Sequence, residues 1–163
     1  MQKDRKFMLY SVVLVGIFSC FAMDIWQQLI KNLFNFPASN WGMVGRWFLT
    51  FVNSKNLIVL DVESKDSFKN EKIVGWILHY CIGIIYALVF WILAYPLEVL
   101  STTLLDGILF GAISVVVPWF FFLPCMGKGV LALKSAKPVL ICTLAFFTHI
   151  VFGVAIALLF NVF

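Results

Sequence analysis

The sequence predicts an all-α integral membrane protein with four transmembrane helices, and three observations carry this prediction. Hydrophobic residues make up 63% of the 163 residues, whereas charged residues make up only 12%. No Lys or Arg occurs from Ile73 through Gly127, and no formal charge of either sign occurs from Pro138 through Phe163. Each gap is longer than the roughly 20 apolar residues that cross a bilayer, so lipid is the expected solvent.

The first predicted span runs from Phe7 to about Ile30. Three basic residues precede it, as in a signal peptide, and Ile17-Phe18-Ser19-Cys20 resembles a lipoprotein cleavage box. The bulky Phe18 fits that box poorly, and the apolar run continues beyond it. We therefore expect a retained first membrane helix.

Three further spans are predicted at 73–95, about 102–123 and 138–160, within a single transmembrane domain. The long first connection contains an apolar, Trp-rich segment from Trp41 to Val52 that is too short to cross a bilayer. We interpret it as an interfacial or re-entrant segment. Pro96 to Ser101 is expected to form a tight turn, and Pro138 suits the first turn of the last helix.

A weak internal repeat relates the second and fourth spans. The pattern His-x3-Gly-x3-Ala-Leu-x-Phe begins at His79 and again at His149, which gives five identities within twelve positions. Each copy follows a Gly-basic pair, Gly45-Arg46 in the first half and Gly127-Lys128 in the second. A helix pair repeated in tandem implies a pseudo-twofold axis along the membrane normal.

The repeat predicts a polar site in one half of the membrane, because the first and third helices leave on the side from which the second and fourth enter. Ionisable residues inside spans are costly and face protein or water rather than lipid. The principal candidates for binding a ligand or ion are Asp24, Arg46, His79 and His149, and the secondary candidates are Gln27, Trp47, Tyr80 and Lys128.

Several of these residues also have structural interpretations. Asp24 sits near enough to the end of its span for solvation by headgroups. Arg46 could pair with Asp24 or bind a lipid phosphate or a substrate anion. It could also simply extend to the headgroups beside its Trp residues. The histidines stand in ladders of small residues, where they could serve only as interhelical hydrogen-bonding groups. Asp106 lies at the start of the third helix and is expected to cap it.

The chemistry of the site is left open. His79, His149 and Asp24 are competent as metal ligands or as a proton relay, and the two histidines could hold a haem through both axial positions. No H-E-x-x-H, G-x-S-x-G or Walker motif is present, so no enzyme class is indicated. The cysteines show no zinc-type spacing and are interpreted as small core residues: Cys20, Cys81, Cys125 and Cys142.

Charge bears on partners and on orientation. A net charge of +4 with scattered basic residues offers no stripe for phosphates, so nucleic acid is excluded as a partner. Nine basic residues on the site side favour its placement in the cytoplasm, whereas Lys3, Arg5 and Lys6 resist translocation of the N-terminus. The sidedness of the termini therefore stays open, and membrane lipids and further copies of the chain are the expected partners.

The chain resembles a family of small bacterial inner-membrane proteins catalogued as a domain of unknown function. The resemblance covers nearly the whole length and implies a multi-pass four-helix protein of the bacterial inner membrane. Its recurring polar positions match Asp24, Arg46, His79 and His149. The strings that carry it are Met23-Asp24-x-Trp26, Pro37 with Asn40-Trp41-x3-Gly45-Arg46-Trp47, Gly75-Trp76-x2-His79-Tyr80-x2-Gly83, Pro124-x-Met126-Gly127-x-Gly129 and His149-x3-Gly153.

Three functions follow as hypotheses. The first is a module that binds or transports an ion, a proton or a small polar ligand, as an oligomer because of its small size. The second is a metal- or haem-dependent enzyme or redox protein that acts on a lipophilic substrate such as a quinone or a lipid. The third is an accessory subunit in which the polar residues only hold helices together.

Overall fold

The regular structure of the chain is entirely helical. A computed structural model describes residues 2–163, with side chains from residue 8 onward, and no strand occurs in that range. Four helical stretches are long and apolar enough to cross a membrane: Met8–Phe34, Glu71–Ala94, Leu104–Cys125 and Pro138–Phe160. The predicted fold class is therefore confirmed. The side chains of Lys3, Arg5 and Lys6, which bear on orientation, lie outside the described side chains.

The first two helices have well-defined ends. Helix α1 spans Gln2–Phe34 and passes the predicted boundary near Ile30, because it stops only at Asn35, whose left-handed backbone has φ 55°. Helix α2 spans Trp41–Ser54, and the Asn40 side chain accepts a hydrogen bond from its third backbone amide at 3.1 Å. With 14 residues, α2 is too short to cross a bilayer, as expected for the Trp-rich segment.

The second and third spans each begin beside a carboxylate. Helix α3 spans Glu71–Ala94, and the Glu71 carboxylate accepts a hydrogen bond from the backbone amide of Phe68 at 3.0 Å. Helix α4 spans Leu104–Ser114, and the Asp106 carboxylate accepts hydrogen bonds from Ser101 N at 3.0 Å and Thr103 Oγ1 at 2.7 Å. The capping role predicted for Asp106 is confirmed.

The third span changes its helical form partway. After α4, a π-helical turn runs over Pro118–Phe122 and leads into the short helix α5, Leu123–Cys125. Pro118 lacks the amide hydrogen of an α-helical bond, which accounts for the irregular turn. A loop with a short 3-10 turn at Val130–Ala132 then leads to α6, Pro138–Phe160.

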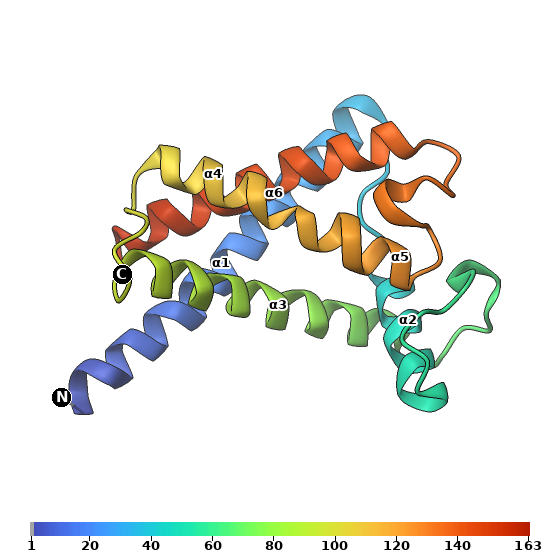
Figure 1. Cartoon of the computed structure of the whole chain (residues 1–163), viewed down its shortest axis with the longest axis horizontal. Coiled ribbons are helices and arrows are strands. Elements are labelled where there is room, and N and C mark those ends of the chain that lie inside the picture. Colours follow the sequence, from blue (N-terminus) through green and yellow to red (C-terminus); the bar gives the residue numbers. More distant parts are fainter. Residues whose placement is uncertain (1) are drawn as a thin grey trace. The chain divides into compact units, whose positions relative to one another are not determined.

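The chain folds into two compact units. Unit 1 consists of the N-terminal segment to Ala38, Tyr80–Ile113 and Phe147–Phe163. Here the two helices of each predicted pair, α1 with α3 and α4 with α6, pack closely at glycine. A Cβ on Gly83 would collide with the Cys20 sulfur, and a Cβ on Gly153 would collide with the Gly107 carbonyl oxygen. Figure 1 shows α4 crossing α6. Gly83 and Gly153 occupy matching positions in the repeat, so both copies use the same small-residue packing.

Unit 2 consists of Ser39–His79 and Ser114–Phe146. The long loop after α2 is tied into it, since the backbone amide of Val59 donates to the carbonyl oxygen of Cys125 at 2.8 Å. A 3-10 turn at Val62–Ser64 lies in the same loop. The buried core of this unit is Trp47, Val59, Val62, Leu123, Cys125, Met126 and Ala132.

The cysteines only partly match their interpretation as core residues. Cys20 and Cys125 are buried and Cys142 is half-buried, but Cys81 is exposed, so the interpretation is wrong for Cys81. Cys81 lies two residues from both His79 and Gly83, which turns it about 200° away from the packed face of α3.

Candidate functional site

Two glycines in unit 2 bring the backbones of α2 and α3 into direct contact. A Cβ on Gly45 would collide with the Glu71 carbonyl oxygen, and a Cβ on Gly75 would collide with the Trp41 carbonyl oxygen. No residue other than glycine fits at either position without separating the helices. This close approach places the side chains that follow Gly45 on α2 against the first turns of α3.

Arg46 is held by that contact. Its Nε donates to Glu71 Oε2 at 2.9 Å and its Nη2 to Glu71 Oε1 at 2.8 Å, which makes a bidentate ion pair. Its Nη1 donates to the carbonyl oxygens of Lys65 at 3.0 Å and Glu63 at 3.4 Å. The side chains of Arg46 and Glu71 are 20% and 16% exposed. Hydrogen bonding to Glu71 raises the pKa of Arg46 above its usual value, so the guanidinium stays charged.

Glu71 is the partner that sequence reasoning missed. The sequence-based alternatives for Arg46 were Asp24, a lipid phosphate or a substrate anion, but Glu71 occupies the Nε–Nη2 edge of the guanidinium. Four hydrogen bonds engage a group that has five N–H donors. Arg46 therefore joins α2, the loop and α3 and has little capacity left for a ligand.

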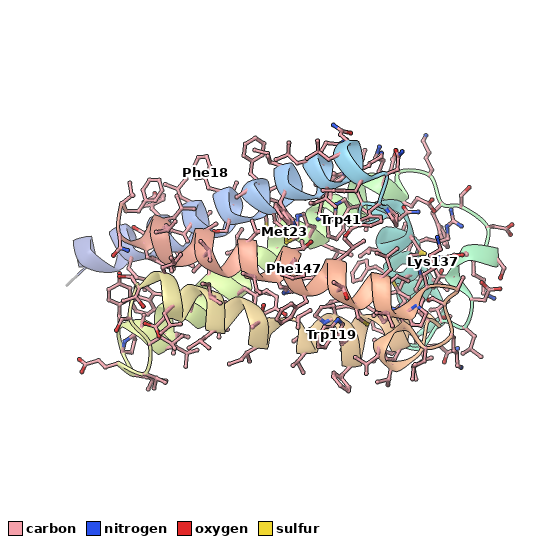
Figure 2. All side chains as sticks on the ribbon, turned by 90° about the horizontal axis from the view of Figure 1, so that it is seen from above. Phe18, Met23, Trp41, Trp119, Lys137 and Phe147 are labelled. Carbon is pink, nitrogen blue, oxygen red and sulfur yellow. The ribbon has the colours of Figure 1, made fainter. Side chains whose placement is uncertain are left out.

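His79 lies in an aromatic cluster of the same unit. Its ring stacks on Trp41 with centroids 4.0 Å apart and an interplanar angle of 21°, and Trp76 approaches at 5.7 Å. The residue is only 5% exposed. Figure 2 labels Trp41 where its side chain lies beside α3. One face of the imidazole is thus covered by an indole, which fixes the orientation of the ring.

Asp24 lies well inside the first span. It lies ten residues before the end of α1 at Phe34, which is a distance of about 15 Å along the helix. Its Oδ2 accepts a hydrogen bond from the Tyr80 hydroxyl on α3 at 3.1 Å, and both residues belong to unit 1. Both are half-buried, whereas Cys20, one turn earlier on α1, is buried. Asp24 and Tyr80, predicted as principal and secondary candidates, are therefore brought together.

His149 lies in unit 1 on α6, where the helix meets α4. A Cβ on Gly111 would collide with the His149 carbonyl oxygen, so the two backbones touch at this level. The imidazole is half-buried, with its edge toward the ring of Tyr86 at 6.2 Å and near Phe152 at 6.4 Å. The two repeat histidines thus have different surroundings: a stacked indole at His79 and edge contacts at His149.

The remaining secondary candidates divide by environment. Trp47 is 5% exposed, and its indole N–H donates to the carbonyl oxygen of Leu57 at 2.9 Å. Lys128 pairs with Glu63 at 3.2 Å, which links the two loops of unit 2. Both therefore serve unit 2 structurally. Gln27 is half-buried on α1, near Asp24 and on a similar face of the helix.

The described side chains do not form a multi-ligand metal centre. Across the side chains described from residue 8 onward, no group of three or more His, Cys, Asp or Glu residues could hold a metal ion. The interpretation of Asp24, His79 and His149 as joint metal ligands gains no support from this arrangement. What unit 1 does provide is a carboxylate and a phenol within spans, and such groups exchange protons or bind cations through oxygen.

Four apolar spans with polar residues inside them define a multi-pass integral membrane protein. The chain belongs to the DUF2938 family, described as proteins of unknown function, whose family model matches residues 13–161. The resemblance noted from the sequence motifs is thereby confirmed. No curated protein and no solved structure was found to match the chain.

Proposed function

We propose that this protein binds an ion or a small polar ligand within the membrane and transports it, with Asp24 at the centre of the site. The observation that carries the proposal is the hydrogen bond between Asp24 and Tyr80 inside two membrane spans. An ionisable side chain inside a membrane span costs a few kcal/mol, so its presence without a function is disfavoured.

The chemistry of this pair favours a cation, the proton included. A carboxylate and a phenolic oxygen are hard oxygen ligands, and the carboxylate is the natural acceptor of a proton. His149 supplies a second titratable group in unit 1, since an imidazole can exchange a proton near neutral pH. Arg46 and His79, engaged by Glu71 and Trp41, are assigned a structural role within unit 2.

The test compares Asp24→Asn with wild type in proteoliposomes that contain the pH-sensitive dye pyranine. A potassium diffusion potential is applied, with Na⁺ or K⁺ as the external cation. We expect wild type to change the internal pH or to take up radioactive sodium, and Asp24→Asn to lose that activity. Asp106→Asn is the matched control, because Asp106 is also a carboxylate in a membrane helix but serves as a cap.

Equal fluxes in wild type, both variants and empty liposomes would contradict the proposal. Thermal unfolding in detergent, with and without NaCl, KCl and MgCl₂, separates loss of transport from loss of folding. A monodisperse Asp24→Asn protein without flux supports the assignment of Asp24.

An accessory structural role is the second candidate function. It is favoured by the four hydrogen bonds of Arg46 and the stacking of His79 on Trp41, which hold helices together without a ligand. Under this alternative, His79→Ala lowers the thermal stability, whereas no tested cation changes it. A cation-dependent stabilisation that requires Asp24 would refute the structural alternative.

We also propose that the protein resides in the inner membrane of a bacterium and associates with copies of itself. The support is its four apolar spans together with its small size of 18.5 kDa. Membrane fractionation and light scattering of the detergent-solubilised protein test these two statements separately.

A further inference from the structure

An apolar groove lies on unit 2, and neither Asp24 nor Tyr80 lines it. Its volume is about 500 Å³, within the usual range for a pocket that holds a small molecule. It is formed by the end of the third span, the loop that follows and the first turns of α6. Its walls are mainly the side chains Trp119, Leu131, Leu133, Val139, Cys142 and Phe146.

The walls of the groove are fixed by the local fold. Trp119 comes from the π-helical turn that begins at Pro118, and its ring stacks on Phe146 with centroids 6.3 Å apart. The loop turns back through Gly129, whose φ is 74°, and presents Leu131. The Cys142 thiol donates to the Leu131 carbonyl oxygen at 3.3 Å, which joins α6 to the loop.

Two lysines are the sequence neighbours of residues that line the groove. Lys134 directly follows the lining residue Leu133, and Lys137 directly precedes the lining residue Pro138. Figure 2 labels Trp119 and Lys137 on this part of the molecule. Both lysines are exposed, and neither forms an ion pair with any side chain described from residue 8 onward.

The surrounding sequence leaves these charges uncompensated. No Asp or Glu occurs after Asp106, whereas Lys128, Lys134 and Lys137 do. Lys128 is already paired with Glu63. The groove therefore combines a mainly apolar lining with two unpaired lysines next to it in the sequence.

The order of charged and apolar residues along the groove matches that of headgroup and acyl chain in a phospholipid. Lys137 lies at the charged end of α6, and Phe146 lies eight residues beyond Pro138, which is about 12 Å deeper along the helix. Polarity thus changes along the groove from cationic to apolar in the direction from headgroup to hydrocarbon. We infer that this groove binds an anionic phospholipid, whose headgroup phosphate pairs with Lys134 and Lys137 while an acyl chain packs against Trp119 and Phe146.

The experiment is native mass spectrometry of the full chain, released from detergent in the presence of phosphatidylglycerol or phosphatidylcholine. We expect bound phosphatidylglycerol to exceed bound phosphatidylcholine. Lys134→Gln/Lys137→Gln should lower the affinity for phosphatidylglycerol by about 5-fold for each lysine removed, following the attraction of a basic side chain to an anionic membrane surface. Thr143→Phe, which fills the groove and keeps both lysines, should also remove the preference.

Lys55→Gln/Lys69→Gln is the matched control, since it removes the same charge from exposed lysines of another loop. It should retain the preference for phosphatidylglycerol. An equal loss in this control would overturn the inference, because net charge alone would then explain the binding. Equal retention of both lipids by wild type would also overturn the inference. The inference would likewise fail if the groove were an interface between two copies of the chain, that is, if the protein formed a dimer that excludes lipid and that Thr143→Phe abolishes.

Discussion

Replacing Gly45 by alanine tests whether the backbone contact between α2 and α3 is essential. A Cβ at this position would overlap the Glu71 carbonyl oxygen and come within 2.8 Å of the Gly75 nitrogen. The neighbouring atoms are backbone, so they cannot rotate away as a side chain could. The two helices would have to separate, which would disturb the Arg46–Glu71 pair and the stacking of Trp41 on His79.

Gly42→Ala is the matched control in the same helix. A Cβ on Gly42 would meet Asn40 Oδ1 at 3.2 Å and Glu71 Oε1 at 3.7 Å, both of which are side-chain atoms. Both substitutions gain up to about 1 kcal/mol from the higher helix propensity of alanine, so this gain cancels in the comparison. Overpacking costs Gly45→Ala about 1–3 kcal/mol, equivalent to a melting temperature about 2–12 °C below that of Gly42→Ala.

The assay is thermal unfolding in mild detergent, followed with a thiol-reactive dye. Cys125 is buried in the core of unit 2 and becomes reactive when that core opens. A Gly45→Ala protein that melts at or above the temperature of Gly42→Ala would refute the close contact.

Three further substitutions test other parts of the fold by the same unfolding assay. Gly127→Ala should destabilise the protein by about 1–3 kcal/mol. The reason is that Gly127 has φ 80° and that a Cβ there would come within 2.5 Å of Asp61 N. An unchanged melting temperature would argue against this loop geometry. Trp47→Phe should cost about 0.5–1.5 kcal/mol, since the carbonyl oxygen of Leu57 loses its indole donor, and a neutral effect would show that water replaces the indole. Asp106→Ala should cost about 1 kcal/mol of unfolding free energy through loss of its capping hydrogen bonds. Asp106→Asn should lose less, because the amide oxygen can still accept. Equal losses in the two variants would exclude capping as the cause.

The spans and their caps could be predicted because they depend on local sequence. Apolar runs bounded by charges locate the membrane helices, and Asp106 lies within five residues of the groups that it caps. The exact ends were less predictable, since α1 continues past Lys31 until Asn35 adopts a left-handed backbone. Such an ending has no marker in hydropathy.

The partners within the candidate site could not be predicted in the same way. Arg46 and Glu71 are 25 residues apart, and Trp41 and His79 are brought together by the same approach of α2 to α3. That approach depends on glycines whose role becomes visible only when the two backbones are seen in contact. The pair Asp24 and Tyr80 was selected by motif, but their hydrogen bond joins residues 56 positions apart and has no local signal.

The core of unit 2 also bears on how such a chain could have arisen. Trp47, Val59 and Val62 come from the first half of the repeat, and they bury themselves against Leu123 and Met126 from the second half. A half-length ancestor would have exposed these side chains unless it paired with a second copy of itself. Val59 and Val62 belong to a long connection that the second half lacks, so fusion of two halves would have let each copy diverge toward a separate task.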